Sequence, residues 1–168
     1  MIEKGALWMA RFTVFLLLLV ESLWLGSSVY FSAFAANELF AQLSENAAAA
    51  AVGALFPTYF FLSALFGVLT AFLYYGTASQ MSISRRPYKY GLTSAIVGAV
   101  FALINLLYML PHIQQIERAM GPISSAPANM VHTFGMWHGI SMLFDLMMMI
   151  CALLVVITLA FALPLQKR

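Results

Sequence analysis

The chain has 168 residues, of which 63% are hydrophobic and only 8% are charged, and its formal net charge is +2. Soluble domains carry about 25% charged residues, so this composition excludes a water-soluble globular protein and favours one dissolved in lipid. No exposed basic segment is interleaved with aromatic residues, which argues against nucleic acid as a partner. The expected surroundings are therefore a lipid bilayer.

Four segments of the chain are apolar and long enough to cross that bilayer. A membrane-spanning helix needs about 20 mostly apolar residues. Residues 8–34, 47–78, 90–110 and 131–163 satisfy this requirement, and polar segments separate them. We therefore predict an all-α fold, an integral membrane four-helix bundle, with residues 1–168 forming a single domain.

The basic residues predict the direction in which the helices cross. If the four segments alternate in direction, only Arg118 falls on one side of the membrane. Seven basic residues fall on the other side: Lys4, Arg11, Arg85, Arg86, Lys89, Lys167 and Arg168. Short segments rich in Lys and Arg stay in the cytoplasm. We therefore expect both termini on the cytoplasmic side of a multi-pass protein in the plasma membrane.

Two prolines are expected to shape the helices. Pro57 interrupts the second apolar segment, removes a backbone donor and crowds the carbonyl of Gly53, which predicts a kink. Pro111 is expected to mark the outer end of the third membrane helix. Beyond it we predict a short amphipathic helix on the membrane surface, which stops at Gly121.

Small residues spaced four apart let helices in lipid approach one another closely. This spacing occurs at Gly135 and Gly139 in the fourth segment, and at Gly91, Ala95 and Ala99 in the third. We expect both faces to lie within a compact bundle.

Several polar side chains fall inside the apolar segments, where each is costly unless it is paired or hydrated. Those expected at a similar outer-to-middle depth are Glu21, Asn105, Ser141 and Asp145, with Tyr59 near the same level or above it. His138 lies two helical turns before Asp145, on the same stripe of the helix. Two interpretations stay open. The group lines an outward-facing polar cavity with His138 near its mouth, or it is a hydrogen-bonded network that only holds the helices together.

A metal site is one version of the cavity interpretation. His138, Met142 and Asp145 recur on one face of the predicted fourth helix. Thioether and imidazole suit copper(I), and carboxylate with imidazole suits harder divalent ions, although methionine also fills membrane cores. Haem would need two axial histidines at one depth, and only His138 lies deep enough. Copper or another metal ion is therefore the candidate cofactor, ahead of haem.

The sequence resembles the transmembrane protein 205-like proteins, a family of small four-span membrane proteins with a domain of unknown function. The matching pieces are Glu38-Leu39-Phe40, Leu55-Phe56-Pro57-x-Tyr59, Asn105 six residues before Pro111, and Phe134-x-x-x-His138-Gly139-x-Ser141. The chain departs from the family pattern at Asp145, where asparagine is usual, and at His112, where arginine is frequent. The resemblance implies the fold and a shared polar core, and ties the chain loosely to drug or metal tolerance.

No sequence motif indicates catalysis. The chain has no GxSxG, no glycine-rich phosphate loop and no Cys–His arrangement, so we expect a non-enzymatic protein. The leading functional hypothesis is that it binds or passes a small cationic or metal-containing solute through the outward-facing polar cavity. The alternative is an accessory or assembly subunit of a larger membrane complex, perhaps respiratory, whose partners are other membrane subunits or further copies of the chain.

Overall fold

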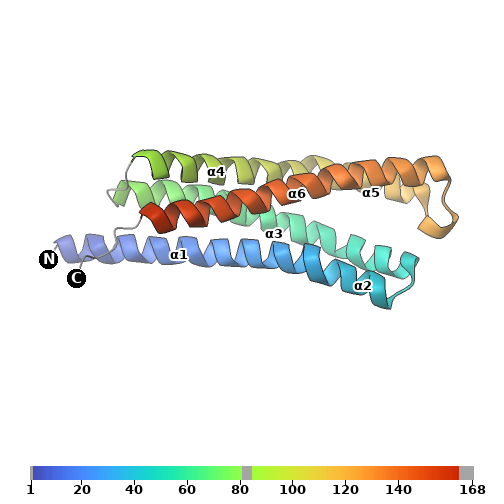
Figure 1. Ribbon diagram of the computed structural model, residues 1–168, viewed down its shortest axis with the longest axis horizontal. Coiled ribbons are helices and arrows are strands. Elements are labelled where there is room, and N and C mark those ends of the chain that lie inside the picture. The colour runs from blue at the N-terminus through green and yellow to red at the C-terminus, as the bar shows by residue number, and fades with distance from the viewer. Residues whose placement is uncertain (1, 81–84, 163–168) are drawn as a thin grey trace.

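The computed structural model describes residues 2–80 and 85–162, and every element in that part of the chain is a helix (Figure 1). The all-α bundle predicted from the sequence is thus confirmed. The elements in chain order are α1 (Ile2–Tyr30), η1 (Phe31–Ala35), α2 (Ala36–Gln42), α3 (Glu45–Gln80), α4 (Arg85–Ile104), η2 (Asn105–Met109), α5 (Leu110–Met120), η3 (Ile123–Ser125) and α6 (Ala128–Ala162).

The helices form a ring in which each long helix has two neighbours. Helix α1 packs against α3 and α6, and α4 packs against the same two helices from the other side. The start of α1, the end of α3, the start of α4 and the end of α6 lie at one end of the bundle (Figure 1). Helices α2 and α5 and the connections after them lie at the other end, which we call the distal end.

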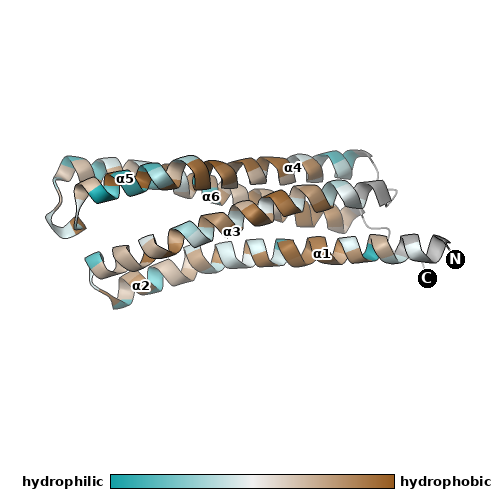
Figure 2. Cartoon of the chain, turned by 180° about the vertical axis from the view of Figure 1, so that it is seen from behind, coloured by the Kyte–Doolittle hydropathy of each residue, from teal (hydrophilic) through white to brown (hydrophobic). Residues whose placement is uncertain are grey.

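The four long helices are suited to a bilayer. In the part of the chain that the structure describes, four helical stretches are long and apolar enough to cross it: Trp8–Gln42, Glu45–Thr77, Arg86–Met120 and Ala128–Phe161. Hydrophobic residues cover their middle portions, and polar residues gather toward the distal end (Figure 2). Large side chains such as Phe15, Phe72 and Phe161 are exposed on the outside. Such a surface would contact lipid, so the chain is a multi-pass membrane protein.

Two of the spans contain a turn of π-helix, which the sequence analysis did not anticipate. Segment η1 joins α1 to α2, and η2 joins α4 to α5, with helical backbone on both sides of each. The prediction that Pro111 ends the third helix is therefore wrong. Pro111 lies two residues after the end of the π-turn, where the ladder of hydrogen bonds has just shifted register, so its missing donor does not stop the helix.

Helix α5 is consequently a continuation of α4 and not a separate helix on the membrane surface. It ends as predicted at Gly121, whose positive φ of 71° favours glycine. Pro57 lies inside α3, which continues on both sides of it. The kink expected at Pro57 stays a prediction.

Small residues bring α4 close to both of its neighbours. A Cβ atom at Gly67 of α3 would lie 2.9 Å from the Cα of Ala99, and one at Gly98 would lie 3.0 Å from the Cβ of Cys151 on α6. Ala95 and Ala99 are buried, which confirms the small-residue face predicted for the third segment. The corresponding prediction for Gly135 and Gly139 is wrong, because both are exposed and a Cβ there would meet nothing within 4 Å. That face of α6 points away from the bundle.

Candidate functional site

The best-connected polar group of the bundle is the carboxylate of Asp145 on α6. Tyr59 of α3 donates a hydrogen bond of 2.6 Å to Oδ1, and Ser32 of η1 donates one of 3.0 Å to Oδ2. Asp145 is only 7% exposed, and the ring of Phe31 stacks on Tyr59 with centroids 4.6 Å apart. Three helices are therefore joined through one carboxylate, with an aromatic layer beside it.

A second polar pair joins α6 to the third span. Ser141 donates a hydrogen bond of 3.0 Å to Oδ1 of Asn105, and Nδ2 of Asn105 donates one of 3.2 Å to the carbonyl of Ser141. Asn105 is the first residue of η2, and Ser32 lies in η1. Both π-turns therefore present a side chain to α6, in keeping with the tendency of such turns to occur at functional sites.

Glu21 lies deeper in the bundle than the other predicted polar residues. It is 1% exposed, and among the described residues neither carboxyl oxygen has a hydrogen-bond partner of full geometry, although Thr70 of α3 is its polar neighbour. Ser32, which contacts Asp145, is eleven residues further along the same helical path, or roughly 16 Å at 1.5 Å per residue. The structure therefore separates the two carboxylates that sequence reasoning placed at a similar depth.

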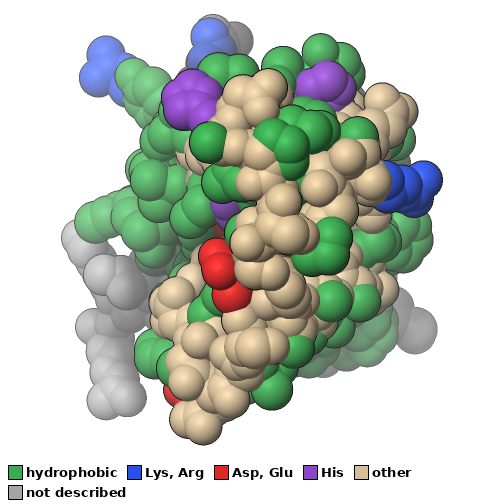
Figure 3. Space-filling view, turned by 90° about the vertical axis from the view of Figure 1, so that its right-hand side faces the viewer, with side chains coloured by type: hydrophobic (Ala, Val, Ile, Leu, Met, Phe, Trp, Pro, Cys, Tyr) green, Lys and Arg blue, Asp and Glu red, His purple; other side chains and the backbone are tan. Residues whose placement is uncertain are grey.

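A cavity of about 170 Å³ opens at the distal end, between α2, α3, α5 and α6. Its walls are mostly apolar and aromatic, with three polar side chains. The lining residues are Phe40, Ala49, Val52, Gly53, Phe56, Leu110, Ile113, Gln114, Glu117, Ile123, Phe134 and His138. Figure 3 looks onto this end, where a histidine and an acidic side chain border a hollow between the helices.

Of the polar residues singled out in the sequence, only His138 lines this cavity. Its imidazole stacks on Phe134, with centroids 5.6 Å apart, and approaches Phe56 at 5.9 Å. The carboxylate at the cavity is Glu117 of α5, a residue of the segment that was predicted to lie on the membrane surface. Glu117 is half-buried, and its Oε1 would lie 3.3 Å from a Cβ at Gly53. The amphipathic pattern of residues 110–120 was the only feature of the sequence that could have indicated a role for Glu117.

The residues expected to hold copper are not gathered at one point. Met142 is 60% exposed, whereas Asp145 lies on the buried side of the same helix. Within the described residues, no three His, Cys, Asp or Glu side chains are close enough together to hold a metal ion. A metal ligand set of His138, Met142 and Asp145 therefore has no support from this geometry.

The fold and the buried polar groups define a class, the multi-pass helical membrane proteins. Residues 19–122 match the model of a family described as a domain of unknown function, DUF4149, and the chain belongs to that family. No curated protein and no solved structure matches the chain. The matched region contains Glu21, Tyr59, Asn105 and Glu117, while His138, Ser141 and Asp145 lie beyond it on α6.

Proposed function

We propose that this membrane protein binds a small cationic solute in the distal cavity and does so without catalysing a reaction. The observation that carries the proposal is the Glu117 carboxylate, half-buried in a cavity whose other walls are largely aromatic and aliphatic. Arg118, its neighbour in the chain, is exposed to solvent. The carboxylate is thus the charged group of the cavity lining, and it favours a positively charged occupant.

The chemistry of the walls favours an organic cation over a bare metal ion. A metal ion needs several converging donors, and Glu117 is the one carboxylate in the lining. Phe56 and Phe134 offer ring faces, which attract ammonium groups through cation–π interactions. The volume corresponds to about five or six water molecules at about 30 Å³ each. An ammonium ion with small alkyl substituents suits both the size and the lining.

Glu117→Gln should weaken the binding of such a cation about tenfold, which corresponds to the loss of about 1.4 kcal/mol of charge pairing. The probe is tetramethylammonium, and the measurement is equilibrium dialysis against the protein purified in mild detergent. The matched control is Glu38→Gln, since Glu38 is an exposed carboxylate of α2 that bonds Gln42 and does not line the cavity. Absence of binding to the unaltered protein, or equal weakening by both substitutions, would contradict the proposal.

The finer assignments from the sequence are also part of this proposal. The motif residues around Pro57, Asn105 and His138 support a place among the transmembrane protein 205-like proteins. The distribution of Lys and Arg supports cytoplasmic termini and the plasma membrane as the location. Drug or metal tolerance, loosely associated with that group, is compatible with a protein that handles cationic compounds.

A role as a subunit of a larger complex is the second candidate, and the exposed face of α6 favours it. Gly135 and Gly139 lie one turn apart on that face with no side chain packed over them, and such pairs allow close contact with another helix. Native mass spectrometry of the gently purified protein tests this role. Stoichiometric partner chains that are lost from a Gly139→Leu variant would support it, and a monomer in both samples would exclude it.

A further inference from the structure

One wall of the distal cavity is formed by the main chain of α3. Gly53 is among the lining residues, and because glycine has no side chain, it contributes backbone atoms to the wall. The Glu117 carboxylate packs against this backbone, since a Cβ atom at Gly53 would lie 3.3 Å from its Oε1. A main-chain segment of α3 therefore lies beside the charged group of the cavity.

The carbonyl oxygen of Gly53 lacks its usual helical donor. In an α-helix, the carbonyl of one residue accepts a hydrogen bond from the N–H group four residues later. Four residues after Gly53 comes Pro57, which has no N–H group, and α3 continues as a helix on both sides of it. A backbone carbonyl in a membrane is costly unless a donor reaches it. The Gly53 carbonyl is thus available to an occupant of the cavity.

Gln114 of α5 provides a further acceptor. It lies three residues before Glu117, a spacing that brings two side chains onto one face of a helix, and both residues line the cavity. The side-chain oxygen of Gln114 accepts hydrogen bonds, as the carboxylate does. Together with the Gly53 carbonyl, α3 and α5 offer three acceptors to one small space.

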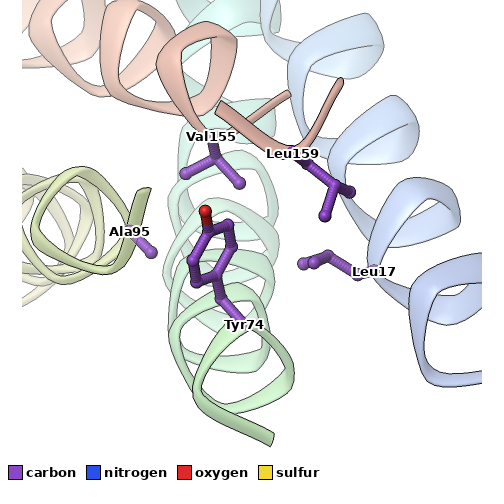
Figure 4. Packing of buried hydrophobic residues seen from close by; sticks show 5 residues of the cluster. All are labelled: Leu17, Tyr74, Ala95, Val155 and Leu159. Carbon is purple, nitrogen blue, oxygen red and sulfur yellow. The ribbon is translucent and has the colours of Figure 1, made fainter. Parts of the chain in front are cut away.

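The interior between this cavity and the opposite end of the bundle is filled by packed side chains. One cluster of buried residues surrounds Trp24. A second cluster joins all four long helices and consists of Leu17, Tyr74, Ala95, Val155 and Leu159 (Figure 4). A solute therefore reaches the three acceptors from the distal end.

We propose that the occupant of the distal cavity is a protonated primary amine, an inference that rests on the proposed function and narrows its substrate class. A primary ammonium group has three N–H donors, as the lysine side chain has. Glu117, Gln114 and the Gly53 carbonyl accept one each. The alkyl part lies against the rings of Phe56 and Phe134. A quaternary ammonium ion has no N–H group, so it can use only the charge and the ring faces.

The first test compares two cations of equal charge. Ethylammonium should bind the full chain in mild detergent about tenfold more tightly than tetramethylammonium, because only ethylammonium donates hydrogen bonds. Equilibrium dialysis at pH 7, where ethylamine is protonated, measures both affinities. Equal affinities, or tighter binding of tetramethylammonium, would overturn the inference and leave the proposed function standing. If neither cation bound, both would fail.

The second test returns a donor to the Gly53 carbonyl. Pro57→Ala restores the missing N–H group, and because Pro57 is exposed and does not line the cavity, no side chain of the wall changes. Binding of ethylammonium should weaken about fivefold, while that of tetramethylammonium stays the same. The matched control is Pro111→Ala, since Pro111 is also an exposed proline within a helical span and outside the lining.

A third variant does not depend on the backbone of α3. Gln114→Leu keeps a side chain of similar size but removes the amide oxygen, and it should also weaken only ethylammonium, about fivefold. Gln115→Leu is its control, because Gln115 is exposed and does not line the cavity. If Pro57→Ala and Gln114→Leu weakened both cations equally, they would have altered the shape of the cavity and not its acceptors, and the inference would be wrong.

Discussion

Gly91→Ala is expected to lower the free energy of unfolding by about 3 kcal/mol, at the upper end of the usual cost of overpacking. A Cβ atom at Gly91 would overlap the ring and hydroxyl of Tyr74 and lie 2.6 Å from Oγ1 of Thr158. Tyr74 cannot easily yield, because it is fully buried and its hydroxyl bonds the carbonyl of Pro87 and the hydroxyl of Thr158, each at 3.3 Å. The substitution therefore forces α3, α4 and α6 apart.

The measurement is a titration with increasing concentrations of a denaturing detergent, in which circular dichroism monitors the unfolding. Gly26→Ala is the matched control, because Gly26 is also helical but a Cβ there would meet nothing within 4 Å. That change should leave stability unaltered or raise it slightly, since alanine is the better helix former. If the two variants unfold at the same denaturant concentration, the Tyr74 side chain does not pack closely against Gly91 in the protein.

Trp24→Ala should destabilise the bundle by about 3 kcal/mol or more, because it removes the largest fully buried side chain and leaves a cavity. The indole occupies a slot between α3 and α4. Its Cη2 atom would lie 3.1 Å from a Cβ at Gly67 and 3.2 Å from one at Gly98. Two glycines thus make room for one ring.

The same substitution at Trp8 provides the comparison, since Trp8 is on the same helix but 67% exposed, against 1% for Trp24. Trp8→Ala should change the unfolding free energy by a few tenths of a kcal/mol at most, in the range of surface changes. Both variants can be measured in the same detergent titration. Equal losses of stability would show that the indole of Trp24 is not packed in the bundle.

The four spans could be predicted because lipid imposes a simple requirement on length and polarity. Each predicted segment overlaps one of the long helices, but the helices extend further at the distal end. Residues 110–120 are too polar to register as a span, and Pro111 normally signals a boundary. The π-turn at residues 105–109 has no recognisable signature in one sequence. For this reason the segment that contains Glu117 was predicted to lie on the membrane surface, and the place of Glu117 at the cavity was missed.

The individual polar residues of the interior could be predicted from the sequence, but the hydrogen bonds between them could not. Asp145, Tyr59, Asn105 and Ser141 were singled out because charge and amide groups are costly in lipid, and all are buried. Helical spacing put Met142 on the same stripe as Asp145, yet three residues correspond to about 60° of rotation. The edge of the buried face falls between them. Only the packing of neighbouring helices decides where that edge lies.

The buried serines between α1 and α3 gave no usable signal in the sequence. Hydroxyl side chains in membrane helices commonly bond the preceding turn of their own helix, as Ser22 does with the carbonyl of Leu18. Ser28 and Ser63 look the same in the sequence as Ser22. What distinguishes them is the antiparallel register of α1 and α3, which is a property of the tertiary structure.

The two π-turns make the distal end sensitive to chain length as well as to residue identity. A π-turn accommodates one extra residue in a helix, and one residue corresponds to about 100° of rotation. The faces that α2 and α5 present are set by that extra residue, since both helices follow a π-turn. Two homologues with the same side chains but one residue more or fewer in this region would turn Glu117 in different directions. Insertions and deletions, more than substitutions, are thus the changes by which evolution could redesign this cavity.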